Sequence, residues 1–116
     1  MKVRKILLVE DLELAQIIAK YTLSSLNCDV DIANNGMEAI QKVQENKYDY
    51  IFMDLGLPDM TGFTVAEKIR EFNDTPIIAI TAHVDTQYKA QALACGMNGF
   101  LSKPLDEKAV KALLKS

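Results

Sequence analysis

The sequence contains no tryptophan, one histidine, two cysteines and three prolines among its 116 residues. The cysteines, Cys28 and Cys95, match no metal-binding or redox spacing, so we expect two idle thiols in a reducing compartment. Acidic residues outnumber basic residues, and the formal charge is −3. This charge argues against a nucleic-acid-binding surface, which needs an excess of basic residues. No apolar run approaches the roughly 20 residues of a membrane helix. We therefore expect no direct nucleic-acid partner and no membrane contact by this domain.

What is present is ordinary for a soluble globular protein: 49% of the residues are apolar and 25% are charged. A chain of this length corresponds to one domain, here residues 1–116, and is large enough to fold without a metal or a disulfide. Residues 1–9 are too short and too rich in β-branched residues for a signal peptide. The expected location is the cytoplasm.

Short apolar runs alternate with longer amphipathic segments along the chain. Strands are predicted near residues 3–9, 30–33, 50–53, 76–80 and 100–101. The first intervening segment has a helical stripe at i, i+3, i+4 and i+7, a pattern that ordinarily faces the core: Leu14, Ile17, Ile18 and Tyr21. Strict alternation of strands and helices predicts an α/β fold with a doubly wound parallel sheet covered by helices on both faces.

Two further signals fix helix ends in the second half of the chain. Gly96 is well placed as the stop of an alanine-rich helix over residues 85–95. Asp106 is a typical N-cap for the last helix, whose predicted inward residues are Ala109, Val110, Leu113 and Leu114.

Polar side chains stand at the carboxyl ends of the predicted strands. Glu10 and Asp11 follow the first strand and Asp54 the third, while Thr81 and Lys103 follow the fourth and fifth. The carboxyl ends of parallel strands share one edge of the sheet, where doubly wound folds bind their ligands. We therefore expect three acids, a hydroxyl and an ammonium group to converge there.

Three clustered carboxylates repel one another, and a divalent cation together with Lys103 would balance their charge. Oxygen ligands without histidine or cysteine favour Mg²⁺ or Mn²⁺. Such a site suits a phosphoryl group, with Asp54 as the nucleophile that forms an acyl phosphate. Taken singly, each residue has an ordinary explanation: Glu10 and Asp11 could cap a helix, and Lys103 could be a solvated surface lysine. Their joint placement favours the site.

Four motifs in order resemble the receiver, or phosphoacceptor, domain of two-component response regulators: "ILLVED" at 6–11, "IFMDLGLPDMTG" at 51–62, "IIAITA" at 77–82 and "GFLSKPL" at 99–105. The resemblance covers the whole chain. It implies a flavodoxin-like (βα)5 sandwich whose five-stranded parallel sheet has the order 2-1-3-4-5.

The resemblance also implies a role for each matching residue. Asp54 would be phosphorylated, and Asp11, Asp54 and the backbone carbonyl of Gly56 would bind Mg²⁺, with Glu10 holding it through water. Lys103 would pair with the phosphoryl group. Further residues match the switch and its surroundings: Thr81 and Phe100 as the switch pair, Ala82 as the small residue beside it, His83 as a position that tunes acyl-phosphate hydrolysis, and Pro104 as a cis-proline candidate.

By resemblance, the phosphoryl donor is the phosphohistidine of a histidine kinase or of a histidine phosphotransfer domain. Phosphorylation would change the face formed by the fourth helix, fifth strand and fifth helix, which would contact an output domain or protein. The segments "VEDLELAQ" and "LSKPL" favour the receiver of a hybrid sensor histidine kinase over a stand-alone regulator. The hybrid would make the domain the cytoplasmic part of a membrane-bound kinase. On this interpretation the domain assists its own phosphorylation and dephosphorylation without being a turnover enzyme.

Three other functions share parts of this pattern. A phosphatase of the haloacid dehalogenase type needs a second Asp two positions after the nucleophile, where this chain has Gly56. A flavin-binding flavodoxin needs a hydroxyl- and glycine-rich loop after the first strand, where Glu10 and Asp11 would repel a phosphate. A degenerate receiver that only mediates contacts would not need the full set of site residues.

Overall fold

Strands and helices alternate strictly along the chain, as predicted. The computed structural model describes residues 3–82 and 85–115. The strands are β1 (Arg4–Val9), β2 (Cys28–Ala33), β3 (Tyr50–Asp54), β4 (Ile77–Thr81) and β5 (Gly99–Ser102). The helices are α1 (Glu13–Ser25), α2 (Gly36–Glu45), α3 (Gly62–Arg70), α4 (Thr86–Ala94) and α5 (Glu107–Lys115). None of these helices, within the described ranges, is long and apolar enough to span a bilayer.

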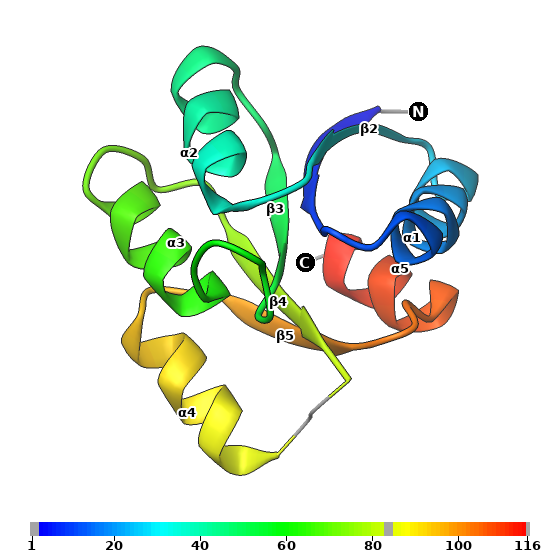
Figure 1. Cartoon of the computed structure of the whole chain (residues 1–116). Helices are drawn as coiled ribbons and strands as arrows, with labels where there is room; N and C mark the ends of the chain where they lie inside the picture. The colour runs from blue at the N-terminus through cyan, green and yellow to red at the C-terminus, as the bar shows by residue number, and fades with distance from the viewer. Residues whose placement is uncertain (1–2, 83–84, 116) are drawn as a thin grey trace.

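All five strands pair in parallel, in the order β2-β1-β3-β4-β5 (Figure 1). This order confirms the α/β doubly wound, flavodoxin-like sandwich. The strand order reverses at β1, which lies between β2 and β3, and doubly wound sheets bind their ligands beside this switch point.

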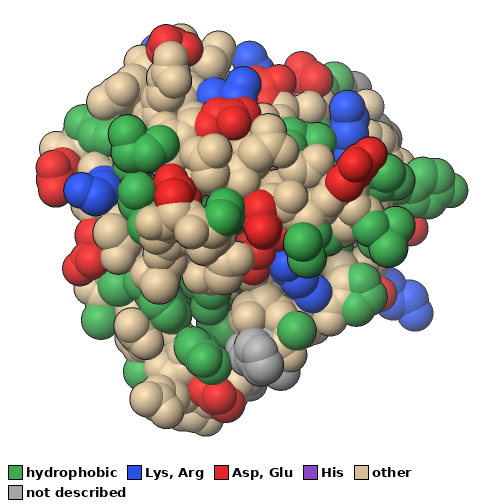
Figure 2. Space-filling model, viewed as in Figure 1, with side chains coloured by type: hydrophobic (Ala, Val, Ile, Leu, Met, Phe, Trp, Pro, Cys, Tyr) green, Lys and Arg blue, Asp and Glu red, His purple; other side chains and the backbone are tan. Residues whose placement is uncertain are grey.

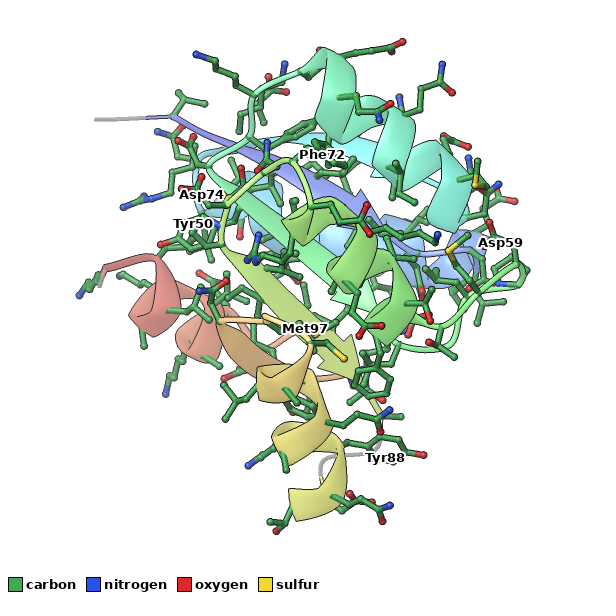
Figure 3. The ribbon with its side chains drawn as sticks, turned by 90° about the vertical axis from the view of Figure 1, so that its left-hand side faces the viewer. Tyr50, Asp59, Phe72, Asp74, Tyr88 and Met97 are labelled. Atoms are coloured by element: carbon green, nitrogen blue, oxygen red, sulfur yellow. The ribbon has the colours of Figure 1, made fainter. Side chains whose placement is uncertain are left out.

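Helices α2, α3 and α4 cover one face of the sheet, the α2–α4 side, while α1 and α5 cover the other, the α1–α5 side (Figure 1). Successive strand residues enter opposite layers because side chains alternate along a strand. Leu7 and Val9 pack with the α2–α4 side, whereas Ile6 and Leu8 pack with the α1–α5 side. Figure 3 looks onto the α2–α4 side, where Met97 lies buried beside α4.

Several helix ends have the expected cap. The side chain of Asp106 accepts a hydrogen bond from the Ala109 amide at 3.1 Å, which confirms the predicted N-cap of α5. Gly96, with a φ of 90°, follows the last residues of α4 in the left-handed region that favours glycine. Asp85 and Asn35 cap α4 and α2 in the same way as Asp106.

The predicted apolar stripe of α1 faces solvent rather than the core. Its four members, Leu14, Ile17, Ile18 and Tyr21, are all exposed, and the buried residues of α1 are instead Ala19 and Leu23. The inward face of α1 thus combines one small residue, Ala19, with one large residue, Leu23. Two smaller corrections accompany this one: Ala109 of α5 is exposed, and Val3 lies outside β1.

Candidate functional site

The polar residues expected at the strand ends lie at one edge of the sheet. Asp54 is the last residue of β3 and Thr81 the last of β4, and these two strands pair in register. Glu10 and Asp11 follow β1 directly, and Lys103 follows β5. Their common location results from parallel pairing, because every carboxyl end points the same way.

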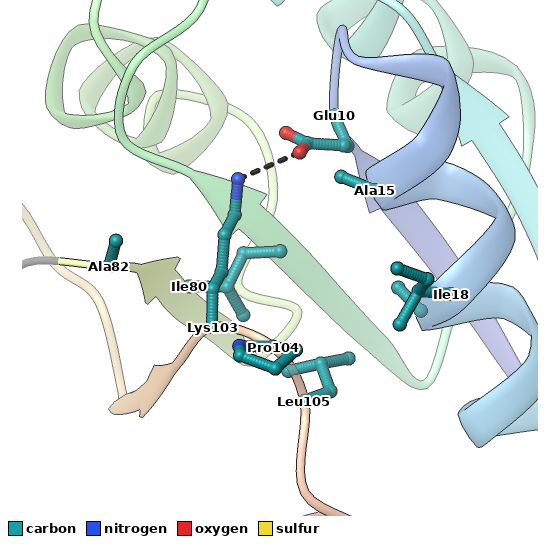
Figure 4. Close-up of a pocket in the computed structure, with 9 residues that line it drawn as sticks. Glu10, Ala15, Ile18, Ile80, Ala82, Lys103, Pro104 and Leu105 are labelled. Carbon is teal, nitrogen blue, oxygen red and sulfur yellow. Dashed lines mark hydrogen bonds and ion pairs between the residues drawn. The ribbon is translucent and has the colours of Figure 1, made fainter.

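Three carboxylates come together at this edge. Glu10, Asp11 and Asp54 each offer an oxygen atom, and these oxygens lie within 4.8 Å of one another. The Lys103 Nζ atom is 2.7 Å from Glu10 Oε1 and 3.2 Å from Asp54 Oδ1. Figure 4 shows the lysine reaching from the end of β5 toward Glu10. The ammonium group therefore bridges two of the three acids.

Burial sets the protonation of this cluster. Glu10 is 1% exposed, and burial, with the neighbouring Asp54 carboxyl, raises the pKa of Glu10 to about 7 although Lys103 opposes the shift. Burial acts to lower the pKa of Lys103, but Glu10 and Asp54 outweigh it and raise that pKa. At neutral pH Lys103 is therefore charged, whereas Glu10 needs a further positive charge to be fully ionised.

The donor set fits a hard divalent cation. Glu10 Oε2 is buried and has no hydrogen-bond partner among the described residues, which is costly for a carboxylate oxygen unless a ligand satisfies it. The three converging groups are all oxygen donors, the preference of Mg²⁺ and Ca²⁺ rather than of Zn²⁺. A cation here would satisfy the orphaned oxygen and reduce the repulsion between the acids.

The loop after β3 holds the Asp54 carboxylate. The backbone N–H of Gly56 donates to Asp54 Oδ1 at 3.3 Å, and Gly56 pairs with Thr61 in an isolated antiparallel bridge. Gly62, at the start of α3, packs directly on the Asp54 backbone, and a Cβ there would collide with the Asp54 carbonyl oxygen. This close approach explains why the loop returns to α3 through a glycine.

Glu10 and Asp11 do not cap α1. The N-cap position is Leu12, and it makes no side-chain capping bond. The ordinary explanation for these two acids therefore fails, and both remain available to the carboxylate cluster.

Thr81 and Phe100 lie on adjacent strands next to the cluster. Thr81 is buried, and its carbonyl oxygen accepts a hydrogen bond from the Lys103 amide at 2.8 Å. Phe100 is half-buried against the α2–α4 side, with Lys89 Nζ 5.9 Å from its ring centroid. In the pairing of β4 with β5, Phe100 lies opposite Ala79, and Ser102, two residues later, lies opposite Thr81.

Three further predicted residues border the site or lie outside the described part. Ala82 is exposed beside it, and the Lys103–Pro104 peptide bond is cis, as the resemblance implies. His83 lies outside the described residues.

Two residues that hold the loops of the site, Gln16 and Asp59, carry no clear functional signal in the sequence. Gln16 Nε2 donates to the Glu10 carbonyl oxygen at 2.6 Å and to Asn34 Oδ1 at 2.7 Å. Asp59, labelled in Figure 3, accepts bonds from the Gly36 and Met37 amides at 2.8 and 3.0 Å, which ties the loop after β3 to the start of α2. In the sequence, Asp59 carries only a turn signal within "GLPDMTG".

The structure thus places a buried carboxylate beside an ammonium group and two further acids, at the switch point of a doubly wound sheet, and this cluster is a candidate cation site in a flavodoxin-like domain. Comparison with known proteins identifies the family. Residues 6–115 match the model of the response regulator receiver domain. The chain therefore belongs to the receiver domain family of two-component signalling.

Individual relatives agree with this assignment. The chain is 37% identical to the aerobic respiration control sensor protein ArcB of Escherichia coli, over 95% of this chain and 14% of that protein. It is 37% identical to the response regulator ArlR of Staphylococcus saprophyticus, over 97% of this chain and 51% of that protein. It thus spans between one-seventh and about half of the length of these two relatives.

A solved structure gives the same result. The receiver domain of a sensor histidine kinase from Pseudomonas aeruginosa matches with a TM-score of 0.89 and 32% identity, over 98% of this chain and 96% of that one. That crystal structure holds a magnesium ion in its active-site cleft.

Proposed function

We propose that the domain is a phosphorylation-controlled switch in which Asp54 accepts a phosphoryl group from the phosphohistidine of a histidine kinase or histidine phosphotransfer domain. The observation that carries this proposal is the buried Asp54 carboxylate, held 3.2 Å from the Lys103 ammonium beside two further acids. Family membership supports it, since receiver domains interact with such donors. No turnover of a diffusible substrate is required.

The transfer is an in-line displacement at phosphorus. An Asp54 oxygen forms the new O–P bond while the P–N bond to the donor imidazole breaks, and the electron pair of that bond goes to the imidazole nitrogen, which takes up a proton. Lys103 stands where it can pair with the phosphoryl oxygens, and the Gly56 amide orients the nucleophile through Oδ1. Because both groups are already in position before the reaction, the activation free energy for building up charge on the phosphoryl oxygens is lower.

The residues proposed to hold Mg²⁺ are Asp11, Asp54 and the backbone carbonyl of Gly56, with Glu10 acting through water. The orphaned Glu10 oxygen and the spacing of the carboxylates support this set, as does the magnesium ion of the Pseudomonas receiver. When bound, the cation supplies charge neutralisation for the carboxylates and the incoming phosphoryl oxygens. Mn²⁺ has the same preference for oxygen ligands, so the same residues would hold it.

The proposed output uses Thr81 and Phe100. A phosphoryl group on Asp54 adds hydrogen-bond acceptors and negative charge, toward which the Thr81 hydroxyl moves. Phe100 would then turn into the space that Thr81 leaves, and the face of α4, β5 and α5 would shift its population toward a second packing. A cavity of about 150 Å³ between α4 and β5, bordered by Phe100 and the exposed Leu93, lies on this face. An output domain or protein is its proposed partner.

Labelling with ³²P-acetyl phosphate in magnesium buffer tests the acceptor. The unsubstituted domain and Ser102→Ala should both acquire label, because Ser102 is exposed and outside the carboxylate cluster. Asp54→Asn should remain unlabelled, since a carboxamide oxygen is a poor nucleophile. Equal labelling of the Asn variant would assign the phosphate to another residue. Thr81→Ala should be labelled yet show no change in the Phe100 ring signals by NMR.

We also propose that the parent protein is a hybrid sensor histidine kinase. The match to ArcB, a sensor protein far longer than this chain, supports the assignment. The match to ArlR, a response regulator, favours the alternative of a separate regulator. The genomic reading frame around this coding sequence distinguishes the two alternatives. A kinase core upstream supports the hybrid kinase, and stop codons at both ends support the separate regulator.

A further inference from the structure

The backbone of Glu10, the first acid of the site, is held on both sides by neighbouring elements. Its amide donates a hydrogen bond to the Ala33 carbonyl oxygen at the end of β2, 3.0 Å away. Its carbonyl oxygen accepts a hydrogen bond from the Gln16 side chain of α1, whose Nε2 atom is 2.6 Å away. The peptide units before and after Glu10 are therefore both fixed, one by β2 and the other by α1.

The peptide unit between Glu10 and Asp11 joins two of the three carboxylates in the cluster. Because this unit is planar, only ψ of Glu10 and φ of Asp11 set the direction of one Cα–Cβ bond relative to the other. The carbonyl oxygen that Gln16 holds belongs to this unit. The hydrogen bond from Gln16 therefore restrains both dihedral angles, and with them the place of the Asp11 carboxylate beside Glu10.

The side-chain amide of Gln16 is itself held in one orientation. Its Nε2 atom also donates to Asn34 Oδ1 at 2.7 Å, so the two amide hydrogens serve two acceptors. If the amide were flipped, Gln16 Oε1 would face two other acceptor oxygens. Asn34 follows β2 and directs its Nδ2 atom toward the Glu38 carboxylate at 3.4 Å. We call the bonds from Gln16 to Glu10 and Asn34 the Gln16 tether.

The start of α1 gives this loop no side-chain cap. Leu12 is the N-cap residue of α1 and makes no capping bond, whereas Asn35 and Thr61 cap α2 and α3 with a side-chain oxygen. The Gln16 tether, which begins one turn further into α1, thus fixes the loop that carries the two acids at a helix end where capping does not.

Repulsion among the acids gives the Gln16 tether its effect. Figure 2 shows acidic side chains and a basic one close together near the middle of the surface. In a metal-free domain the carboxylates of Glu10, Asp11 and Asp54 repel one another, and an unrestrained loop would lower this repulsion by moving away. The tether opposes that movement and keeps the oxygens within 4.8 Å of one another. A cation then binds ligands that are already in place, which favours binding.

We infer that Gln16 is a positioning residue for the magnesium site, and that the Gln16 tether raises the affinity of the domain for the cation by acting through the backbone of Glu10. This inference rests on the Mg²⁺ site that belongs to the proposed function of Asp54. Hydrogen-bond partners of metal-ligating groups commonly have this effect, and their removal lowers metal affinity about 10- to 100-fold.

The test measures magnesium affinity on the unphosphorylated domain. The unsubstituted domain, Gln16→Met, Asn34→Ala and Gln41→Met are titrated with magnesium chloride, and binding is followed by the NMR shift of the Asp11 amide. Gln16→Met keeps the length of the side chain and removes both donors. Gln41→Met is the matched control, because Gln41 is exposed on α2 and its side chain bonds Glu45. Urea unfolding with and without magnesium accompanies each titration.

We expect Gln16→Met to raise the dissociation constant for magnesium about tenfold. Asn34→Ala should raise it about threefold, because the bond to Glu10 remains while the amide loses its second acceptor. Gln41→Met should bind magnesium as the unsubstituted domain does. At magnesium concentrations far above every dissociation constant, the cation should stabilise Gln16→Met by about 1.4 kcal/mol less, the equivalent of a tenfold change.

Labelling with ³²P-acetyl phosphate separates positioning from a direct part in the transfer. In limiting magnesium, Gln16→Met should be labelled about tenfold more slowly than the unsubstituted domain, because less of it holds the cation. Saturating magnesium should restore the rate to within about twofold, since the bonds of Gln16 go to Glu10 and Asn34 rather than to the phosphoryl site.

Several results would overturn the inference. Magnesium affinity in Gln16→Met within twofold of the unsubstituted value, an equal loss in Gln41→Met, slow labelling that saturating magnesium does not restore, or no magnesium binding by the unsubstituted domain each contradict it. If Gln16→Met does not fold, Asn34→Ala tests the same tether, and unchanged affinity there contradicts it. An unsubstituted domain that binds magnesium but takes no label would instead contradict the proposed function of Asp54, while the titrations still decide the role of Gln16.

Discussion

The helices on the two sides of the sheet bury their apolar side chains to different degrees. On the α2–α4 side, α3 buries five of its nine residues, whereas on the α1–α5 side the longer α1 buries only two, Ala19 and Leu23. The largest apolar residues of α1 face solvent, and a cavity remains between α1 and the chain after β5. Helix α3 thus closes its part of the sheet by packing, whereas α1 retains apolar surface next to the site.

This difference predicts where substitutions will affect the stability of the fold. A packed face contributes to folding through burial and close contact, and its substitutions should be felt in the free energy of unfolding. An exposed apolar face contributes little to folding, so its substitutions should change this free energy little. Matched substitutions on the two sides can test the distinction directly.

The largest expected effect comes from an isoleucine pair. Ile69→Ala in α3 removes a fully buried side chain and should lower the free energy of unfolding by about 3 kcal/mol. Ile17→Ala in α1 removes an exposed side chain and should change it by less than about 0.5 kcal/mol. Urea denaturation followed by far-ultraviolet circular dichroism measures both. Equal losses would show that α1 packs on its stripe after all.

A glycine pair tests the packing of the loop that carries Asp54. Gly62→Ala should destabilise the domain by about 2 kcal/mol and weaken labelling of Asp54, because the added Cβ meets the Asp54 backbone. Gly56→Ala is the control, since no atom beyond those of its chain neighbours lies within 4 Å of the position that its Cβ would take. Thermal unfolding of both variants, with acetyl phosphate labelling of each, checks this prediction. A Gly62→Ala variant with unchanged stability would contradict the close approach.

The smallest effect concerns Asp59 on the α2–α4 side. Asp59→Ala should cost about 1 kcal/mol, because two amides at the start of α2 lose their acceptor. Asp59→Asn, which keeps an acceptor oxygen, should recover much of this loss at pH 7. Chemical denaturation of the three proteins gives the comparison.

The pH dependence of the Asp59 contribution has a definite sign. The Gly36 amide, followed by that of Met37, lowers the pKa of Asp59 in the folded protein from its usual value of 3.8. The unfolded chain therefore binds the proton first as the pH falls. The contribution is fully present above pH 3.8 and disappears as the pH drops through the lower, folded pKa. A stability difference between wild type and Asp59→Ala that grew toward acid pH would contradict this sign.

Much of the fold follows from local patterns in the sequence. The apolar runs predict all five strands, and the polar residues that follow them predict which edge carries the site. Asp106 as a cap and Gly96 as a stop are equally local, because each depends on backbone groups a few residues away. The pattern by itself gives parallel strands, whereas their order rests on the resemblance to receiver domains.

The orientation of α1 could not be predicted in this way. Its sequence contains two candidate inward faces, one with Leu14, Ile17 and Tyr21 and another with Ala19 and Leu23. Hydrophobicity favours the first, but the structure buries the second. Helical periodicity reveals that a face is apolar, and only the shape of the sheet beneath decides which face fits.

The sequence alone determined the alternation of strands and helices and the acids, hydroxyl and lysine at the strand ends, because both depend on the local spacing of side chains. The tertiary structure decided that Lys103 meets Glu10 across 93 positions of chain and that burial raises the pKa of Glu10 to about 7. It also decided that α1 keeps its large apolar residues in solvent. These features depend on contacts between segments that lie far apart in the chain and on the burial that those contacts produce. Both arise only when the sheet assembles.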